Sequence, residues 1–85
     1  MYYIYFLKSR RDGKLYIGIS DNPERRLSQH NLGNTKSTKN RTPFDLIYKE
    51  KFATRIEARN REKFLKSFSG VKEKRKIIEN LNIGD

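Results

Sequence analysis

Several residue types that support common chemistries are absent or scarce. The 85-residue chain has no cysteine and one histidine. These absences exclude disulfides, thiol nucleophiles, cysteine-based zinc sites and metal sites built from imidazoles alone. No apolar run approaches the roughly 18 residues that a membrane-spanning helix needs, and no basic segment precedes the apolar residues 2–7 as it does in a secretion signal. We therefore expect a soluble, cytoplasmic protein.

Negative charge is also scarce. Ten acidic residues face 20 lysines and arginines, and the formal net charge is +10. A chain this short buries only about 60% of the surface that its unfolded form exposes, so most of these charges must lie in water. A positive surface attracts polyanions, nucleic acid first and anionic membranes second, through counterion release and long-range attraction. The length allows one domain, which we expect to span residues 1–85.

Aromatic and β-branched residues gather in two neighbouring segments. They occupy residues 2–7 and 15–19, and Arg-Asp-Gly at residues 11–13 is a turn signal between them. This pattern predicts a β-hairpin. Any register that pairs odd with even positions puts Tyr5 and Tyr16 on the same face of the hairpin. Both faces are largely apolar, so we expect the hairpin to lie between two other layers.

Helix signals follow the hairpin. Asp-Asn-Pro-Glu at residues 21–24 begins one helix and Gly33 ends it, while Thr54 and Glu57 form a capping box that begins another. Ser-Gly at residues 69–70 is expected to end this second helix. The sequence thus predicts an α+β fold in which a small three-stranded antiparallel sheet is flanked by helices. The remaining expected elements are helices from Pro23 to about His30 or Asn31, over about 55–68 and over about 71–81, and a third strand over 44–52.

The helix expected over residues 55–68 has two distinct faces. On a helical wheel, Glu62 lies at the border between a core-facing arc and a basic arc. Its carboxylate is either held partly desolvated there or forms a surface ion pair with Arg59 or Lys66. Arg61 projects into the apolar arc, where it must snorkel or pair with a buried carboxylate. The core-facing arc is Ala58, Phe64, Leu65 and Phe68, and the basic arc, here called the basic ridge, is Arg55, Arg59, Lys63 and Lys66. In the last helix we expect Val71, Ile77, Ile78 and Leu81 to be buried.

A polar and basic loop is expected over residues 33–43. It has no large apolar side chain, and its hydroxyls, amides and cations are the groups that contact backbone phosphates. Such a loop is often simply mobile. With Arg25 and the basic ridge, it makes up the predicted nucleic-acid contacts, namely Arg25, Lys36, Lys39, Asn40, Arg41, Arg55, Arg59, Lys63 and Lys66.

Short motifs give a more specific indication. Tyr3-Ile4-Tyr5 and Tyr16-Ile17-Gly18 resemble the two halves of the motif that names the GIY-YIG nuclease family, with Tyr3 where that name has glycine. Residues 24–31 resemble the helix that follows in the family, and Glu57-Ala58 and Arg61-Glu62-Lys63 resemble its carboxylate helix. The resemblance covers nearly the whole chain. It is to small single-domain members that are similar to the N-terminal nuclease module of the excision-repair subunit UvrC.

The resemblance implies catalytic roles for five residues. Glu62 would be the one protein carboxylate that binds Mg²⁺ or Mn²⁺, and Arg26 would stabilise charge on the phosphoryl oxygens. Tyr16, with Tyr5 beside it, would be a general base or would orient the attacking water, since a tyrosine pKa of about 10 makes a weak base at neutral pH. His30 would carry protons or contact phosphate, or would be an ordinary surface histidine near the end of its helix.

Three functions remain open at this point. The resemblance favours a divalent-metal-dependent endonuclease that hydrolyses DNA phosphodiester bonds, in repair or recombination. The alternative is a nucleic-acid-binding module that keeps the nuclease fold without cleaving. A membrane-surface or protein-interaction domain is the least favoured, because no strongly amphipathic basic helix carries exposed bulky apolar residues.

Overall fold

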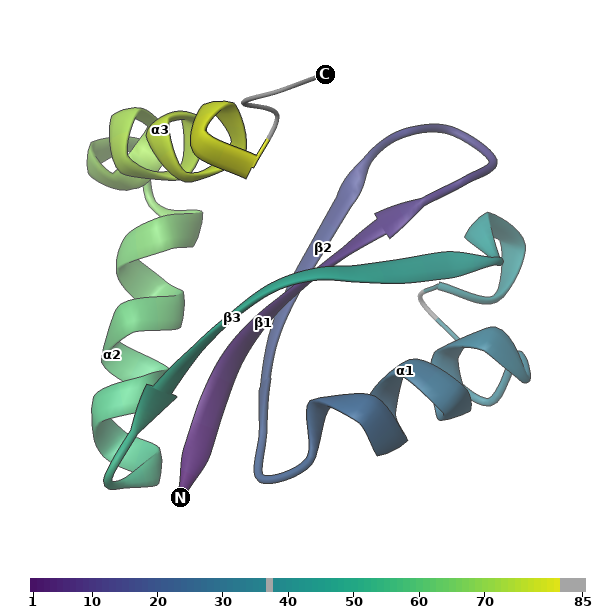
Figure 1. The fold of residues 1–85 in the computed structure, drawn as a ribbon, viewed down its shortest axis with the longest axis horizontal. Helices are drawn as coiled ribbons and strands as arrows, with labels where there is room; N and C mark the ends of the chain where they lie inside the picture. Colours follow the sequence, from purple (N-terminus) through teal and green to yellow (C-terminus); the bar gives the residue numbers. More distant parts are fainter. Residues whose placement is uncertain (37, 82–85) are drawn as a thin grey trace.

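A three-stranded antiparallel sheet forms the middle layer of the protein (Figure 1). β1 (Tyr2–Ser9) lies at its centre, between β2 (Leu15–Ser20) and β3 (Phe44–Phe52). This arrangement confirms the predicted hairpin and third strand.

The computed structural model describes residues 1–36 and 38–81. Ser37 of the predicted loop and residues 82–85 of the predicted domain lie outside the described residues.

The pairing of β1 sets which side chains share a face. Against β2, Tyr5 pairs with Gly18 and Leu7 pairs with Tyr16. Odd positions of β1 therefore face the same way as even positions of β2, and Tyr5 and Tyr16 lie on one face as predicted. Against β3 the register shifts by one residue beyond Phe6, which marks a β-bulge.

Helices cover both faces of the sheet. α1 (Pro23–Asn31) packs on one face, and α2 (Arg55–Lys66) and α3 (Val71–Leu81) pack on the other (Figure 1). Two apolar clusters result, which confirms that the hairpin lies between two layers. The cluster under α2 and α3 is Ile4, Phe6, Ile17, Leu65 and Ile77, and the cluster under α1 is built on Tyr5, Leu7 and Phe44, with Tyr16, Leu27 and Leu46 packed against it.

Local signals fix where the first two helices begin. The side chain of Asn22 accepts a hydrogen bond from the backbone N–H of Arg25 at 3.0 Å, and Pro23 occupies the first turn of α1. At the start of α2, Thr54 Oγ1 accepts from the N–H of Glu57 at 3.3 Å, and Glu57 Oε1 accepts from the N–H of Thr54 at 3.2 Å. The predicted capping box is therefore confirmed.

The end of α2 differs from the prediction. The helix stops at Lys66 rather than at residues 69–70, because Ser67 adopts an extended backbone and its hydroxyl donates to the carbonyl of Phe64. A short 3₁₀ turn (Phe68–Gly70) follows. Phe68 thus leaves the helical wheel and is 96% exposed, so its predicted place in the core is wrong; Phe64, also predicted there, is 41% exposed.

The prediction for α3 is correct in part. Ile77 is buried and Ile78 packs against the same cluster. Val71 and Leu81, which we expected to be buried, are 36% and 40% exposed. They are the first and last residues of the helix, and α3 reaches the core through Ile77 and Ile78 between them.

Arg61 joins three elements through charge. Its guanidinium donates to both carboxylate oxygens of Glu50 in β3, at 2.9 and 3.0 Å, and to Glu73 in α3 at 3.3 Å. Glu50 also accepts from the hydroxyl of Tyr48. Burial acts to raise the pKa of Glu50, but Arg61 and Tyr48 outweigh burial and hold that pKa below its usual range. Of the two readings of Arg61, pairing with a partly buried carboxylate is confirmed.

Replacing Gly70 tests the tight junction between α2 and α3. A Cβ at this position would lie 1.9 Å from the backbone carbonyl oxygen of Phe64, which cannot move without distorting α2. We expect Gly70→Ala to lower the free energy of unfolding by about 1–3 kcal/mol, as overpacking does elsewhere. Urea denaturation measures the loss, and Ser69→Ala at the exposed neighbouring position is the control. A Gly70→Ala protein of wild-type stability would contradict the close approach.

Removing the Arg61 guanidinium tests the charged junction. Arg61→Leu leaves the partly buried carboxylate of Glu50 without its cation. We expect this change to lower the free energy of unfolding by about 2 kcal/mol at pH 7. This loss is smaller than that for a fully buried ion pair, because water reaches the Arg61–Glu50 pair. The pKa of Glu50 is lower in the folded protein than the unfolded value of about 4.3, so its ion pair stabilises the fold at pH values above that. The difference in unfolding free energy between Arg61→Leu and the wild type should therefore shrink below about pH 4.

Urea titrations at several pH values measure this difference. Arg10→Leu removes the bidentate partner of Asp45 at an exposed site and should have a much smaller effect at every pH. Equal losses for the two variants would show that Arg61 is not a structural tie.

Candidate active site

Two phenols and a glycine form the floor of the site. Tyr5 is buried and Tyr16 is half-buried, and their ring centroids are 6.3 Å apart. Gly18 lies directly across from Tyr5, and a Cβ on it would be 2.7 Å from the Tyr5 hydroxyl oxygen and 3.1 Å from a ring carbon of Tyr16. Only glycine lets the Tyr5 phenol lie across β2. The sequence identified Gly18 as part of a motif but gave it no role.

Arg26 extends from α1 to both phenols. Polar contact with the Tyr5 hydroxyl, followed by the influence of Tyr16, raises the pKa of the Arg26 guanidinium above its usual value, so it stays charged. The same guanidinium donates through Nη1 to Oε1 of Gln29 at 2.6 Å, one helical turn along α1. Gln29 was not predicted as a site residue, although its spacing of three from Arg26 allows this contact.

The environment of Tyr5 keeps its hydroxyl protonated. Burial raises the pKa of Tyr5, Arg26 partly offsets this, and the nearby Tyr16 and Glu62 raise it further. A phenol whose pKa lies above the ordinary value of about 10 is neutral at physiological pH. In this protonated form Tyr5 can donate a hydrogen bond to an anion.

His30 is a core residue of the site. It is fully buried, with ring centroids 4.7 Å from Tyr16, 6.5 Å from Tyr5 and 6.0 Å from Phe44. Burial and the charge of Arg26 lower its pKa, so the imidazole is neutral at pH 7. The surface reading of His30 is wrong. The spacing of Leu27 and His30 at i and i+3, both inward from α1, is the signal in the sequence that indicates burial.

Glu62 approaches from the other layer. Its side chain is 20% exposed and accepts from Nζ of Lys66 at 3.1 Å, which confirms both the border position and the pair with Lys66. Its charge is the smallest of the influences that raise the pKa of Tyr5. Among the described residues, no hydrogen bond or ion pair joins Glu62 to Tyr5, Tyr16 or Arg26.

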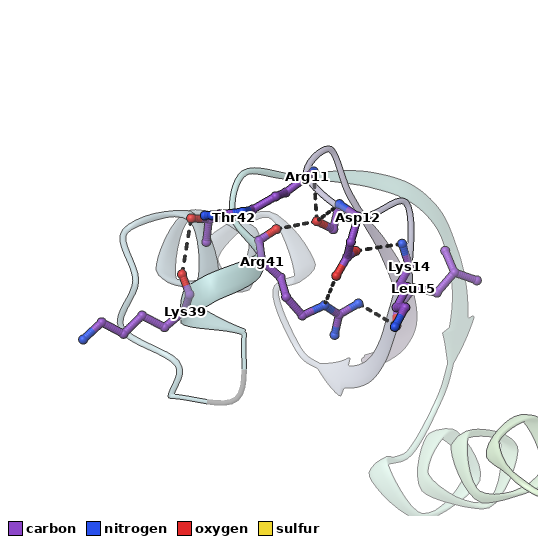
Figure 2. A network of polar contacts seen from close by, with 8 residues as sticks. Arg11, Asp12, Lys14, Leu15, Lys39, Arg41 and Thr42 are labelled. Carbon is purple, nitrogen blue, oxygen red and sulfur yellow. Dashed lines mark hydrogen bonds and ion pairs between the residues drawn. The ribbon is translucent and has the colours of Figure 1, made fainter.

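Hydrogen bonds join the loop after α1 to the hairpin turn between β1 and β2 (Figure 2). Arg41 Nε donates to Asp12 at 3.2 Å and its Nη2 donates to the carbonyl of Leu15 at 3.3 Å. Ser9 donates to the Arg41 carbonyl and accepts from two N–H groups of the turn. The Arg41 guanidinium thus makes structural contacts, and its phosphate contact stays a prediction.

The other predicted nucleic-acid contacts lie at the surface. Arg25 is exposed and pairs with Asp21 at 3.0 Å. The remaining ones are exposed: Lys36, Lys39 and Asn40 in the loop, and Arg55, Arg59, Lys63 and Lys66 in the basic ridge. Among residues 1–36 and 38–81, no three acidic or histidine side chains gather closely enough to hold a metal ion by themselves.

Comparisons with known proteins identify the family. Residues 1–76 match the model of the GIY-YIG catalytic domain. A UPF0213 protein of Staphylococcus saprophyticus is 43% identical over 79 residues, covering 92% of this chain and 95% of that protein. A UPF0213 protein of Natronomonas pharaonis is 38% identical over the same length, covering 92% of each. The solution NMR structure of a UPF0213 protein from Bacillus halodurans superposes with a TM-score of 0.58 at 29% identity, covering 98% of this chain and 89% of that one.

The matched model takes in both strands with the phenols, the helix with Arg26 and His30, and the helix with Glu62. The small relatives match the chain over nearly their whole length. The chain therefore belongs to the GIY-YIG family of nuclease domains.

Proposed function

We propose that this protein is a divalent-metal-dependent endonuclease that hydrolyses DNA phosphodiester bonds. The observation that supports the proposal is that Tyr5, Tyr16, Arg26 and His30 lie together on one face of the sheet. The charge of Glu62 also contributes to the raised pKa of Tyr5. GIY-YIG nucleases act on nucleic acid and generally use divalent metals. A role in repair or recombination rests on the resemblance to the excision-repair module.

The two phenols have different tasks in this mechanism. Tyr5, which stays protonated, donates a hydrogen bond to a phosphate oxygen. Tyr16 is the less buried of the two and orients or deprotonates the attacking water. Arg26 holds its charge beside both, and its planar guanidinium stabilises the negative charge that develops on the phosphoryl oxygens.

Glu62 is the residue that would hold the metal. Mg²⁺ keeps most of its waters and is commonly bound by one or two carboxylates together with substrate phosphate. The single, partly buried carboxylate of Glu62 fits that requirement. Without a metal, the exposed Lys66 neutralises the charge of this carboxylate. When bound, a divalent cation would polarise the phosphate and stabilise its charge as a Lewis acid.

The surface charge supports DNA as the partner. The basic ridge is exposed on the same helix as Glu62, and the chain carries a net charge of +10. Each lysine or arginine that neutralises a phosphate releases counterions, so binding should weaken steeply with salt.

Neutralising Glu62 tests the metal-binding role. Glu62→Gln should lower nicking of plasmid and branched DNA at least about 100-fold in Mg²⁺ or Mn²⁺, because the charge that holds the cation is gone. A chelator should abolish nicking by the wild type. Glu79→Gln, which makes the same charge change at an exposed position of α3, is the matched control and should behave as wild type.

Gel assays of supercoiled plasmid with each metal give the readout. Nicking that persists in Glu62→Gln would refute the assignment. Salt-sensitive binding without cleavage by the wild type under any of these conditions would favour the non-cleaving module instead.

Removing single hydroxyls tests the phenols. Tyr16→Phe should lower kcat about 100-fold while DNA affinity stays near wild type, since general acid–base groups contribute about 10²–10⁴-fold. Tyr5→Phe should also reduce kcat. Tyr2→Phe removes a hydroxyl from an even position of β1, on the opposite face, and serves as control. Near-full cleavage by Tyr16→Phe would rule out both the base and the water-orienting role.

A further inference from the structure

A threonine from the loop reaches the buried histidine. Thr38 is fully buried, and its Oγ1 lies 2.7 Å from Nδ1 of His30. The same oxygen donates to the backbone carbonyl of Thr35 at 3.3 Å. Nothing in the sequence indicated this contact, because Thr38 belongs to a loop that reads as polar and surface-exposed.

The hydroxyl of Thr38 has one proton to give, and this decides the form of the imidazole. If that proton goes to Thr35, Oγ1 accepts from Nδ1–H, and both contacts are hydrogen bonds. If it goes to His30, the contact with Thr35 is lost and Nε2 must carry a buried proton. Among the described residues Nε2 has no hydrogen-bond partner. The first arrangement makes one more hydrogen bond, so it is favoured.

This arrangement leaves Nε2 unprotonated, with a free lone pair, in the layer between the sheet and α1. The imidazole ring stands closest to Tyr16, with Tyr5 and Phe44 also around it. A neutral imidazole with its proton on Nδ1 can accept at Nε2 but cannot donate there. A contact of Nε2 with phosphate oxygens needs a donor, so this form does not fit the phosphate-contact role considered for His30, and the proton-carrying role stays a prediction.

Short-range contacts hold Thr38 in place. Its N–H donates to the carbonyl of Thr35 at 3.1 Å, and its carbonyl accepts from the N–H of Arg41 at 2.9 Å. Arg41 is in turn tied to Ser9 and Asp12 of the hairpin. Thr38 is therefore fixed from both directions along the loop, as a residue must be if its hydroxyl is to orient another group.

We propose that Thr38 is a positioning residue whose hydroxyl holds His30 in the Nδ1-protonated tautomer, with Nε2 unprotonated in the layer that contains the two phenols. Its catalytic consequence rests on the proposed nuclease function. In that reaction the oxygen of the attacking water bonds to phosphorus as the phosphorus–oxygen bond to the sugar breaks. His30, fixed in this tautomer, packs against the ring of Tyr16 and so helps to hold the phenol that orients the attacking water. The proton that the water loses passes to solvent, and the leaving sugar oxygen takes a proton from solvent.

The tautomer can be observed directly, because His30 is the one histidine of the chain. Long-range ¹H–¹⁵N NMR spectra at about pH 8, where the imidazole is neutral, should give wild-type His30 a protonated Nδ1 and an unprotonated Nε2. Thr38→Ser keeps the hydroxyl and should keep this pattern. Thr38→Val removes it at nearly constant volume and should shift both ¹⁵N signals toward an average of the two tautomers.

Thr42→Val removes another hydroxyl of the same loop and is the control, because Thr42 bonds to Lys39 and not to His30. A wild-type spectrum with the proton on Nε2 overturns the proposal, and that outcome does not depend on whether Thr38→Val folds. An unchanged imidazole pattern in a folded Thr38→Val protein overturns it as well.

Cleavage assays then connect the tautomer to catalysis. Thr38→Val should lower kcat roughly 10- to 100-fold, as loss of a group that orients a functional histidine does elsewhere, with KM unchanged and with rescue by Thr38→Ser. A rise in KM alone would mean that Thr38 serves substrate binding and would overturn the positioning role. If the wild type cleaves nothing, the nuclease proposal fails, while the NMR result still decides the tautomer.

Discussion

The fold and the site both depend on the central position of β1. Because it is hydrogen-bonded on both edges, its side chains alternate strictly between two covered faces. Ile4 and Phe6 pack under α2 and α3, while Tyr5 and Leu7 pack under α1. One strand therefore carries the contacts that hold both helical layers and also carries a phenol of the candidate site. A change in the register of β1 would move Tyr5 to the wrong layer and take the apolar core with it.

Charge is used differently in the two layers. On the α2 and α3 side, Arg61 is saturated by two carboxylates and serves to hold helices to the sheet. On the α1 side, Arg26 donates to the amide oxygen of Gln29 and its pKa responds to the nearby phenols, and none of these groups is a carboxylate. A cation left uncompensated beside neutral donors favours an incoming anion. The same residue type thus holds elements together in one layer and keeps an uncompensated charge beside the phenols in the other.

Signals that act over a few residues could be predicted from the sequence. The hairpin, the caps at Asn22 and Thr54 and the shared face of Tyr5 and Tyr16 follow from turn chemistry, capping and a period of two. Features set by tertiary packing could not. Phe68 is exposed because a single serine ends the helix early, and the contact between Thr38 and the buried His30 depends on how the loop after α1 folds back onto that helix. Glu62 could be predicted in part. A helical wheel predicts its position at the border of the apolar arc, but not its distance from the phenols.

The ties among Ser9, Asp12 and Arg41 have a mechanical consequence. They join the loop that bears Lys36 and Lys39 to the far end of the strand that bears Tyr5, and Asn31 joins the end of α1 to Phe44 by two further hydrogen bonds. A displacement of the loop beside Arg41 is therefore passed into the sheet. The position of Lys39 is thus coupled through these bonds to the strand that carries Tyr5.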